Sequence, residues 1–184
     1  MTLDFNEISD HKKFEDLVVS YFEDLKNETG NNISDIRVKP SGVGTDGGRD
    51  ILVIFKITDS IATFERRWVI QCKFHKSSIS PKQIYDVNIP TLLASYKANG
   101  YLLVCREKAT SKLTKLFEDL EKNVEDKHFT IWSGEQFKSQ LLVREKILQQ
   151  YFPRFYAYFL KDIKHLLRRK HSYHIVLQII MNLF

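Results

Sequence analysis

The chain has 184 residues, of which 43% are hydrophobic and 28% charged, and its formal net charge at pH 7 is +5. This composition fits one globular domain with room for an added segment. It excludes a membrane-spanning protein, because no apolar run reaches the ~18 residues that a membrane span needs. The first residues lack the basic-then-apolar order of a signal peptide. We therefore expect a cytoplasmic protein, with Cys72 and Cys105 as buried thiols rather than a disulfide.

The first predicted element is an amphipathic helix over residues 9–28. Its apolar residues recur at helical spacing: Phe14, Leu17, Val18, Tyr21, Phe22 and Leu25. Ser9 or Asp10 can cap its start, and Gly30 can end it. Glu15 falls at the edge of the apolar stripe, where a carboxylate can reach over the end of a packed sheet. The ordinary interpretation of such an acid is a partly exposed helix residue.

Residues 33–39 are predicted to form a short strand that ends in a loop. Arg37 and Lys39 share one face of that strand. The glycine-rich turn that follows ends in Asp50 and leads directly into an apolar strand over residues 51–55. A polar, irregular connection is expected over residues 58–64, and the next strand covers residues 65–74.

The second half of the chain alternates predicted helices and strands. Ser80 and Pro81 start a helix by capping and a first-turn proline, and Pro90 breaks it, so that residues 91–97 form a separate piece. An apolar run over residues 101–105 fits a buried central strand. A helix capped by Thr110, a strand over residues 129–132 and a helix started by a Ser133–Gln136 capping box complete the order. The order predicts an α/β fold with a mixed central sheet flanked by helices.

The stretch from residue 44 to 73 contains the main candidate catalytic residues. Asp50 stands at the start of one strand, and Gln71 and Lys73 share one face of the next, with Cys72 on the other. If the two strands pair, Asp50 lies beside Gln71 and Lys73. Carboxylate and carbonyl oxygens suit Mg²⁺, and a nearby lysine can hold a water or a phosphate. These are the parts needed for metal-assisted phosphodiester hydrolysis.

Each of these residues also has an ordinary explanation when taken singly. An Asp after two glycines is commonly turn chemistry, and a Gln and a Lys on a strand are commonly a solvated face. The combination is far more specific than its parts. It resembles the core of the PD-(D/E)XK nucleases, in the Mrr-like restriction endonuclease branch, and the resemblance covers roughly residues 10–152.

The resemblance implies a restriction-endonuclease-like sheet and Mg²⁺-dependent hydrolysis of double-stranded DNA, with Mn²⁺ as a substitute, in restriction or anti-phage defence. It implies that Asp50 binds the metal, that Gln71 takes the usually acidic position and that Lys73 is catalytic. Because Gln71 is neutral, another acid is expected. The first helix of Mrr-like proteins carries a metal-site glutamate, and Glu15 matches it.

Several further site residues are candidates. The backbone carbonyl of Cys72 is a candidate metal ligand, and Arg49, His75, Lys76 and Lys39 are candidate DNA contacts, although a surface position is the ordinary explanation for each. Two other functions stay open. One is a catalytically silent DNA-binding or assembly module with the same fold. The other is an RNA-directed nuclease.

Residues 153–184 are expected to form a basic and apolar helical extension of the endonuclease domain at residues 1–152. The excess positive charge is concentrated there, and the chain ends in an apolar stretch. The apolar surface of this last stretch is expected to pack on the core, to form a dimer interface or to lead into a further module. A sensor or NTPase module is the expected kind, although no phosphate-binding loop of the Gly-X₄-Gly-Lys-Ser/Thr type occurs in these residues.

Overall fold

The computed structural model describes residues 2–27, 32–42 and 47–168, and these form two compact units. One unit comprises residues 10–137, and the other comprises residues 1–9 together with the chain from residue 138. Three sequence predictions fall outside the described residues: the helix end at Gly30, the first part of the glycine-rich turn at residues 44–46, and the apolar stretch at residues 175–184. The domain boundary at residues 152–153 stays a prediction.

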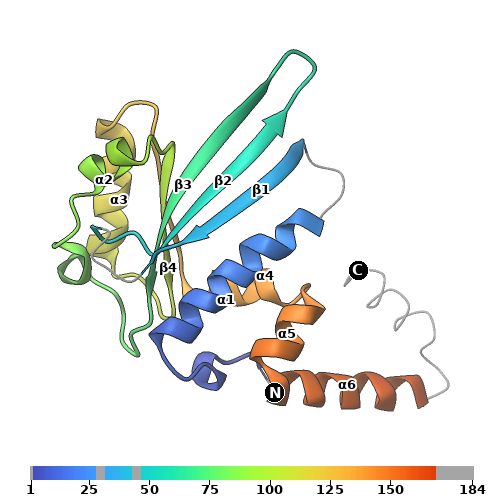
Figure 1. Cartoon of the computed structure of the whole chain (residues 1–184). Helices are drawn as coiled ribbons and strands as arrows, with labels where there is room; N and C mark the ends of the chain where they lie inside the picture. Colours follow the sequence, from blue (N-terminus) through green and yellow to red (C-terminus); the bar gives the residue numbers. More distant parts are fainter. Residues whose placement is uncertain (1, 28–31, 43–46, 169–184) are drawn as a thin grey trace. The chain divides into compact units, whose positions relative to one another are not determined.

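The larger unit is built on a five-stranded mixed sheet in the order β1-β2-β3-β4-β5 (Figure 1). The strands are β1 (Ile33–Pro40), β2 (Ile51–Thr58), β3 (Thr63–Lys73), β4 (Gly100–Cys105) and β5 (His128–Trp132). The first three strands are antiparallel, and β3, β4 and β5 run parallel to one another. The mixed α/β sheet expected from the order of elements is therefore confirmed.

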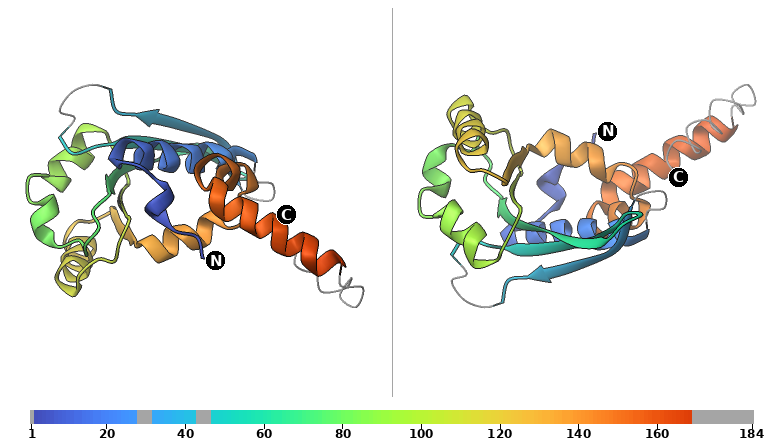
Figure 2. Two further views of the ribbon diagram at one scale, coloured as in Figure 1. Left: turned by 90° about the horizontal axis from the view of Figure 1, so that it is seen from below. Right: turned by 90° about the horizontal axis from the view of Figure 1, so that it is seen from above.

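Helices cover the two faces of this sheet (Figure 2). Helix α1 (His11–Asp24) lies across β1, β2 and β3 on one face. The short 3₁₀ helix η3 (Pro81–Ile84), α2 (Ile89–Ser95) and α3 (Ser111–Asn123) lie on the other face, with α2 against β4 and α3 against β5. The apolar stripe predicted for the first helix is buried, because five of its six residues lose nearly all exposure.

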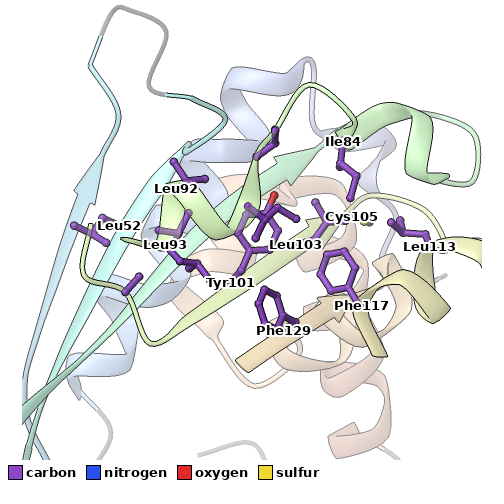
Figure 3. Packing of buried hydrophobic residues seen from close by; sticks show 14 of the residues in the cluster. Leu52, Ile84, Leu92, Leu93, Tyr101, Leu103, Cys105, Leu113, Phe117 and Phe129 are labelled. Atoms are coloured by element: carbon purple, nitrogen blue, oxygen red, sulfur yellow. The ribbon is translucent and has the colours of Figure 1, made fainter. Parts of the chain in front are cut away.

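The core on the α2–α3 side is an apolar cluster centred on β4 (Figure 3). Tyr101, Leu103 and Cys105 alternate along β4 and point into this cluster, while α3 contributes Leu113 and Phe117. Burial raises the pKa of the Cys105 thiol to about 12. Cys105 and Cys72 are free thiols in neighbouring strands, as expected, but only Cys105 is fully buried, whereas Cys72 is partly exposed.

The smaller unit is helical. It contains the 3₁₀ helix η1 (Phe5–Glu7), α5 (Glu145–Tyr151) and α6 (Pro153–Arg168), and α4 (Gly134–Leu141) spans the boundary between the units. The Glu7 carboxylate accepts hydrogen bonds from the N–H groups of Arg154 and Phe155 at 2.8 and 3.1 Å. An anion there is favourable, because the first N–H groups of a helix lack partners within the helix. None of the helices in the described ranges has the length and apolar character needed to cross a membrane.

Local details differ from the sequence predictions in two places. The helix expected from Ser80 is a single 3₁₀ turn, and Pro90 lies in the first turn of α2, where a proline is tolerated. The connection expected over residues 58–64 shortens to a tight turn, because the Asp59 carboxylate accepts hydrogen bonds from two N–H groups of that turn. The end of the chain's helical part is divided into α5 and α6 at Phe152, since Pro153 follows.

Shortening a core side chain tests the packing on β4. Leu103 is fully buried, so Leu103→Ala removes apolar neighbours and leaves a cavity. We expect the free energy of unfolding to fall by about 2–5 kcal/mol. Ile61→Ala is the matched control, because Ile61 is 92% exposed in the β2–β3 turn and should change stability little. Chemical denaturation measures both, and equal stability of the two variants would contradict this packing.

Candidate active site

Two glycines and one carboxylate fix the point where β2 begins beside β3. Gly47 and Gly48 have φ angles of 63° and 93°, which side chains other than glycine rarely adopt. A Cβ on Gly48 would also lie 2.4 Å from a methyl carbon of Val87. The chain then reaches Asp50, whose N–H donates to the Ile70 carbonyl at 3.0 Å. Its Oδ2 accepts a hydrogen bond from the Cys72 N–H at 2.6 Å.

Gln71 lies in the core rather than on an open surface. It is 4% exposed, and its Oε1 accepts a hydrogen bond from the Tyr101 hydroxyl at 2.6 Å. It shares the sheet face of Val69, which belongs to the apolar cluster, so the ordinary interpretation as a solvated strand residue is wrong. A carbonyl oxygen carries two lone pairs, and the Tyr101 hydroxyl uses one of them.

Glu15 on α1 and Asp50 on the sheet interact electrostatically. Burial raises the pKa of Glu15 above its ordinary value, and the negative charge of Asp50 raises it further. Burial also raises the pKa of Asp50, against the opposing effects of the Cys72 hydrogen bond and the positive charge of Lys73. The structure therefore brings Glu15, Asp50 and Lys73 into one electrostatic neighbourhood.

These residues fit a divalent cation. Two carboxylates whose charge is made unfavourable by burial would be stabilised by a cation between them. Hard oxygen donors suit Mg²⁺ or Mn²⁺. Within the described ranges, no group of three or more His, Cys, Asp and Glu side chains is placed to hold a metal. Binding here therefore also needs the Gln71 amide oxygen, main-chain oxygens or water.

The comparisons with known proteins decide the family. Residues 7–140 match the family model of the Mrr catalytic domain, described as a restriction endonuclease. The chain belongs to the Mrr-type restriction endonuclease family. A search among curated proteins finds no match.

Two solved structures are similar to the Mrr-type chain. One is the MspJI restriction endonuclease in complex with a 27-mer oligonucleotide, at 18% identity and a TM-score of 0.46, covering 70% of this chain and 27% of that one. The other is the DNA modification-dependent restriction endonuclease AspBHI, at 11% identity and a TM-score of 0.44, covering 77% of this chain and 38% of that one. The chain therefore spans less than half the length of either.

The four candidate DNA contacts come from three segments of the chain. His75 and Lys76 are exposed just beyond the end of β3, and Lys39 is exposed near the end of β1. The Arg49 guanidinium lies 4.5 Å from the centre of the Tyr96 ring, on the α2 side of the sheet. Their contact with DNA stays a prediction, as does the use of the Cys72 carbonyl as a metal ligand.

Two residues of the site were missed by the sequence analysis. Tyr101 reads as part of a plain apolar strand, and only the register between β3 and β4 reveals that its hydroxyl meets Gln71. His11, at the start of α1, lowers the pKa of both Asp50 and Glu15 through its charge. Its spacing of four residues before Glu15 was the available signal, because residues i and i+4 share a helix face.

The raised pKa of Asp50 predicts a stability change with pH. An acid whose pKa is higher in the folded than in the unfolded protein lowers the free energy of unfolding when it is ionised. This loss is absent below the unfolded-state pKa of about 3.9 and complete above the folded-state pKa. Asp50→Asn removes that loss and keeps an oxygen for the Cys72 N–H. Without metal, the variant should therefore be more stable than the wild type at pH 7, and the difference should vanish near pH 3. Denaturant titrations in a chelator across pH 3–8 measure this, and a wild type more stable at pH 7 would contradict it.

Proposed function

We propose that this domain is a Mg²⁺-dependent endonuclease that hydrolyses phosphodiester bonds of double-stranded DNA, with Mn²⁺ as a substitute, in restriction or anti-phage defence. The single observation that supports it most is the pair of half-buried carboxylates, Asp50 and Glu15, of which Asp50 also interacts with the positive charge of Lys73. Two half-buried acids whose pKa values are raised by burial are a cost to the folded protein, so their presence favours a role in binding a cation.

In this proposal the metal would be held by the carboxylates of Asp50 and Glu15, the Gln71 amide oxygen and the Cys72 carbonyl. Bound Mg²⁺ would supply Lewis acidity for a water and a phosphate oxygen. The Lys73 ammonium would hold the attacking water or a non-bridging phosphate oxygen and stabilise the charge that develops there. The Asp50–Cys72 hydrogen bond keeps the carboxylate in place while the substrate is exchanged.

A catalytically silent DNA-binding module is the second candidate. The observation that favours it is Gln71, because a neutral and buried residue at the usually acidic position reduces the charge available to a metal. An RNA-directed nuclease would use the same residues as the DNA enzyme. Direct cleavage assays separate these functions.

The decisive experiment is incubation of supercoiled plasmid and of a duplex RNA with the purified protein and Mg²⁺ or Mn²⁺. We expect cleavage of the plasmid only, and a rate at least about 10²-fold lower for Asp50→Ala and for Lys73→Ala, because each removes a group that stabilises transition-state charge. A chelator should abolish cleavage. Cleavage by Lys73→Ala at the wild-type rate would refute its role, and binding without cleavage by the wild type would favour the silent module.

The role of Glu15 has its own test. Glu15→Gln keeps the size of the side chain and removes its charge, so we expect a large loss of metal affinity and of cleavage. Asp16→Asn is the matched control, because Asp16 is exposed and lies about 100° further round α1. Titration calorimetry with Mn²⁺ measures the affinities. Equal affinities for the two variants would remove Glu15 from the proposed site.

A further inference from the structure

A basic hollow of about 340 Å³ lies on the sheet face opposite α1. Its floor is part of β2, and its walls come from β1, β3 and the end of α2. The residues that matter for its charge are Arg37, Lys39, Glu65, Arg67 and Lys97. Four cations line the hollow with one acid, and Arg37 also lies 4.0 Å from the Asp35 carboxylate outside it. The net charge is still positive, and an anion is the ligand that this charge favours.

The single acid of the basic hollow is shared between two arginines. Glu65 Oε1 accepts a hydrogen bond from Arg37, and Glu65 Oε2 accepts one from Arg67 Nη2 at 2.8 Å. The hydrogen bond from Arg67 is the main reason why the pKa of Glu65 lies below its ordinary value. Two guanidinium groups are thus arranged around one pair of anionic oxygens, and arginines bind phosphate oxygens in the same arrangement.

The two lysines of the basic hollow have no such partner. Among the described residues, no ion pair or side-chain hydrogen bond is made by Lys39 or Lys97, and both are exposed. Lys97 follows α2 with a φ of 49°, the left-handed conformation usually taken there by Gly or Asn. A lysine side chain is thereby placed on the wall of the hollow at a conformational cost.

The basic hollow lies near the turn that leads to Asp50. A second hollow of about 410 Å³ shares Ser95 and Tyr96 with it and reaches Gly47, in the turn that leads to Asp50. The Arg49 guanidinium covers the Tyr96 ring between the two. Lys39 pairs with Leu52, two residues along β2 from Asp50. At about 3.3 Å per residue along the strand and about 4.8 Å between neighbouring strands, the backbone positions of Lys39 and Asp50 lie about 8 Å apart.

We propose that the basic hollow binds the phosphodiester backbone of the DNA strand next to the bond that is cleaved. Without DNA, the Glu65 carboxylate pairs with Arg37 and Arg67, and a phosphate group of the backbone then takes its place. Each strand of DNA carries one charge per 3.4 Å of helix axis, so cations spread along β1 and β3 can meet successive phosphates. The proposal rests on the proposed function for its substrate, but it concerns binding and needs no catalysis.

The experiment measures DNA binding by the full chain in a chelator, where cleavage cannot occur. Fluorescence anisotropy of a labelled duplex, repeated from low to high salt, gives the slope of log affinity against log salt concentration. That slope changes by about 0.9 for each phosphate that the protein ceases to neutralise. We expect the double variant Lys39→Ala/Lys97→Ala to have a slope smaller by about two and an affinity at least tenfold lower at low salt. The control is Lys112→Ala/Lys122→Ala, two exposed lysines on α3, which should leave the slope unchanged.

The variant Glu65→Gln is expected to change DNA affinity in the direction opposite to that of the double lysine variant. It keeps the shape of the side chain and removes the charge that competes with phosphate, so DNA affinity should rise several-fold. Unchanged or weaker binding by this variant would overturn the role of Glu65. A slope for the lysine variant equal to that of the control would overturn the basic hollow as the backbone site. Displacement of the duplex by millimolar inorganic phosphate or mononucleotide, with only the wild type affected, would instead identify a small-anion site.

These outcomes separate the binding proposal from the catalytic one. A wild type that binds with the expected slopes but cleaves nothing would leave the basic hollow intact and refute the nuclease proposal. Thermal unfolding followed by circular dichroism confirms that each variant is folded before its binding is compared.

Discussion

The hydrogen bond from the Cys72 N–H to Asp50 Oδ2 is the interaction on which the candidate site depends. It joins the first residue before β2 to the exit of β3, and the Asp50 N–H bonds Ile70 from the same position. Because β2 and β3 are antiparallel, this single point brings Asp50 beside Gln71 and Lys73 although they lie more than twenty residues apart in the chain. The glycines before Asp50 make the approach possible, since a Cβ on Gly48 would collide with Val87.

The site draws its groups from both sides of the sheet, and this explains its electrostatics. Glu15 comes from α1 on one face, while Gln71 belongs to the face covered by α2 and α3, where Tyr101 holds it. Packing on both faces removes water from the carboxylates and raises their pKa values. Folding alone therefore does not make this arrangement favourable. A bound cation would supply the missing compensation.

Much of the fold was predictable because local patterns agree with the tertiary structure. The apolar stripe of α1, the uniformly apolar β4 and the Ser133–Gln136 capping box each specify one element in the place where it is found. The site was predictable only in part. The turn ending in Asp50 and the Gln71–Lys73 pair were visible in sequence. The Tyr101 hydrogen bond, by contrast, depends on strand register, and the basic hollow depends on which face of β1 meets α2. Neither is encoded in local spacing.

The measurement that tests this account most directly is X-ray diffraction from crystals soaked in Mn²⁺, with the anomalous signal used to locate the ion. The account predicts a peak between the Asp50 and Glu15 carboxylates, within direct or single-water reach of both, and near Gln71 Oε1. A peak elsewhere on the domain, or one bound by Asp50 with Glu15 turned away, would contradict the claim that these two acids form one metal site.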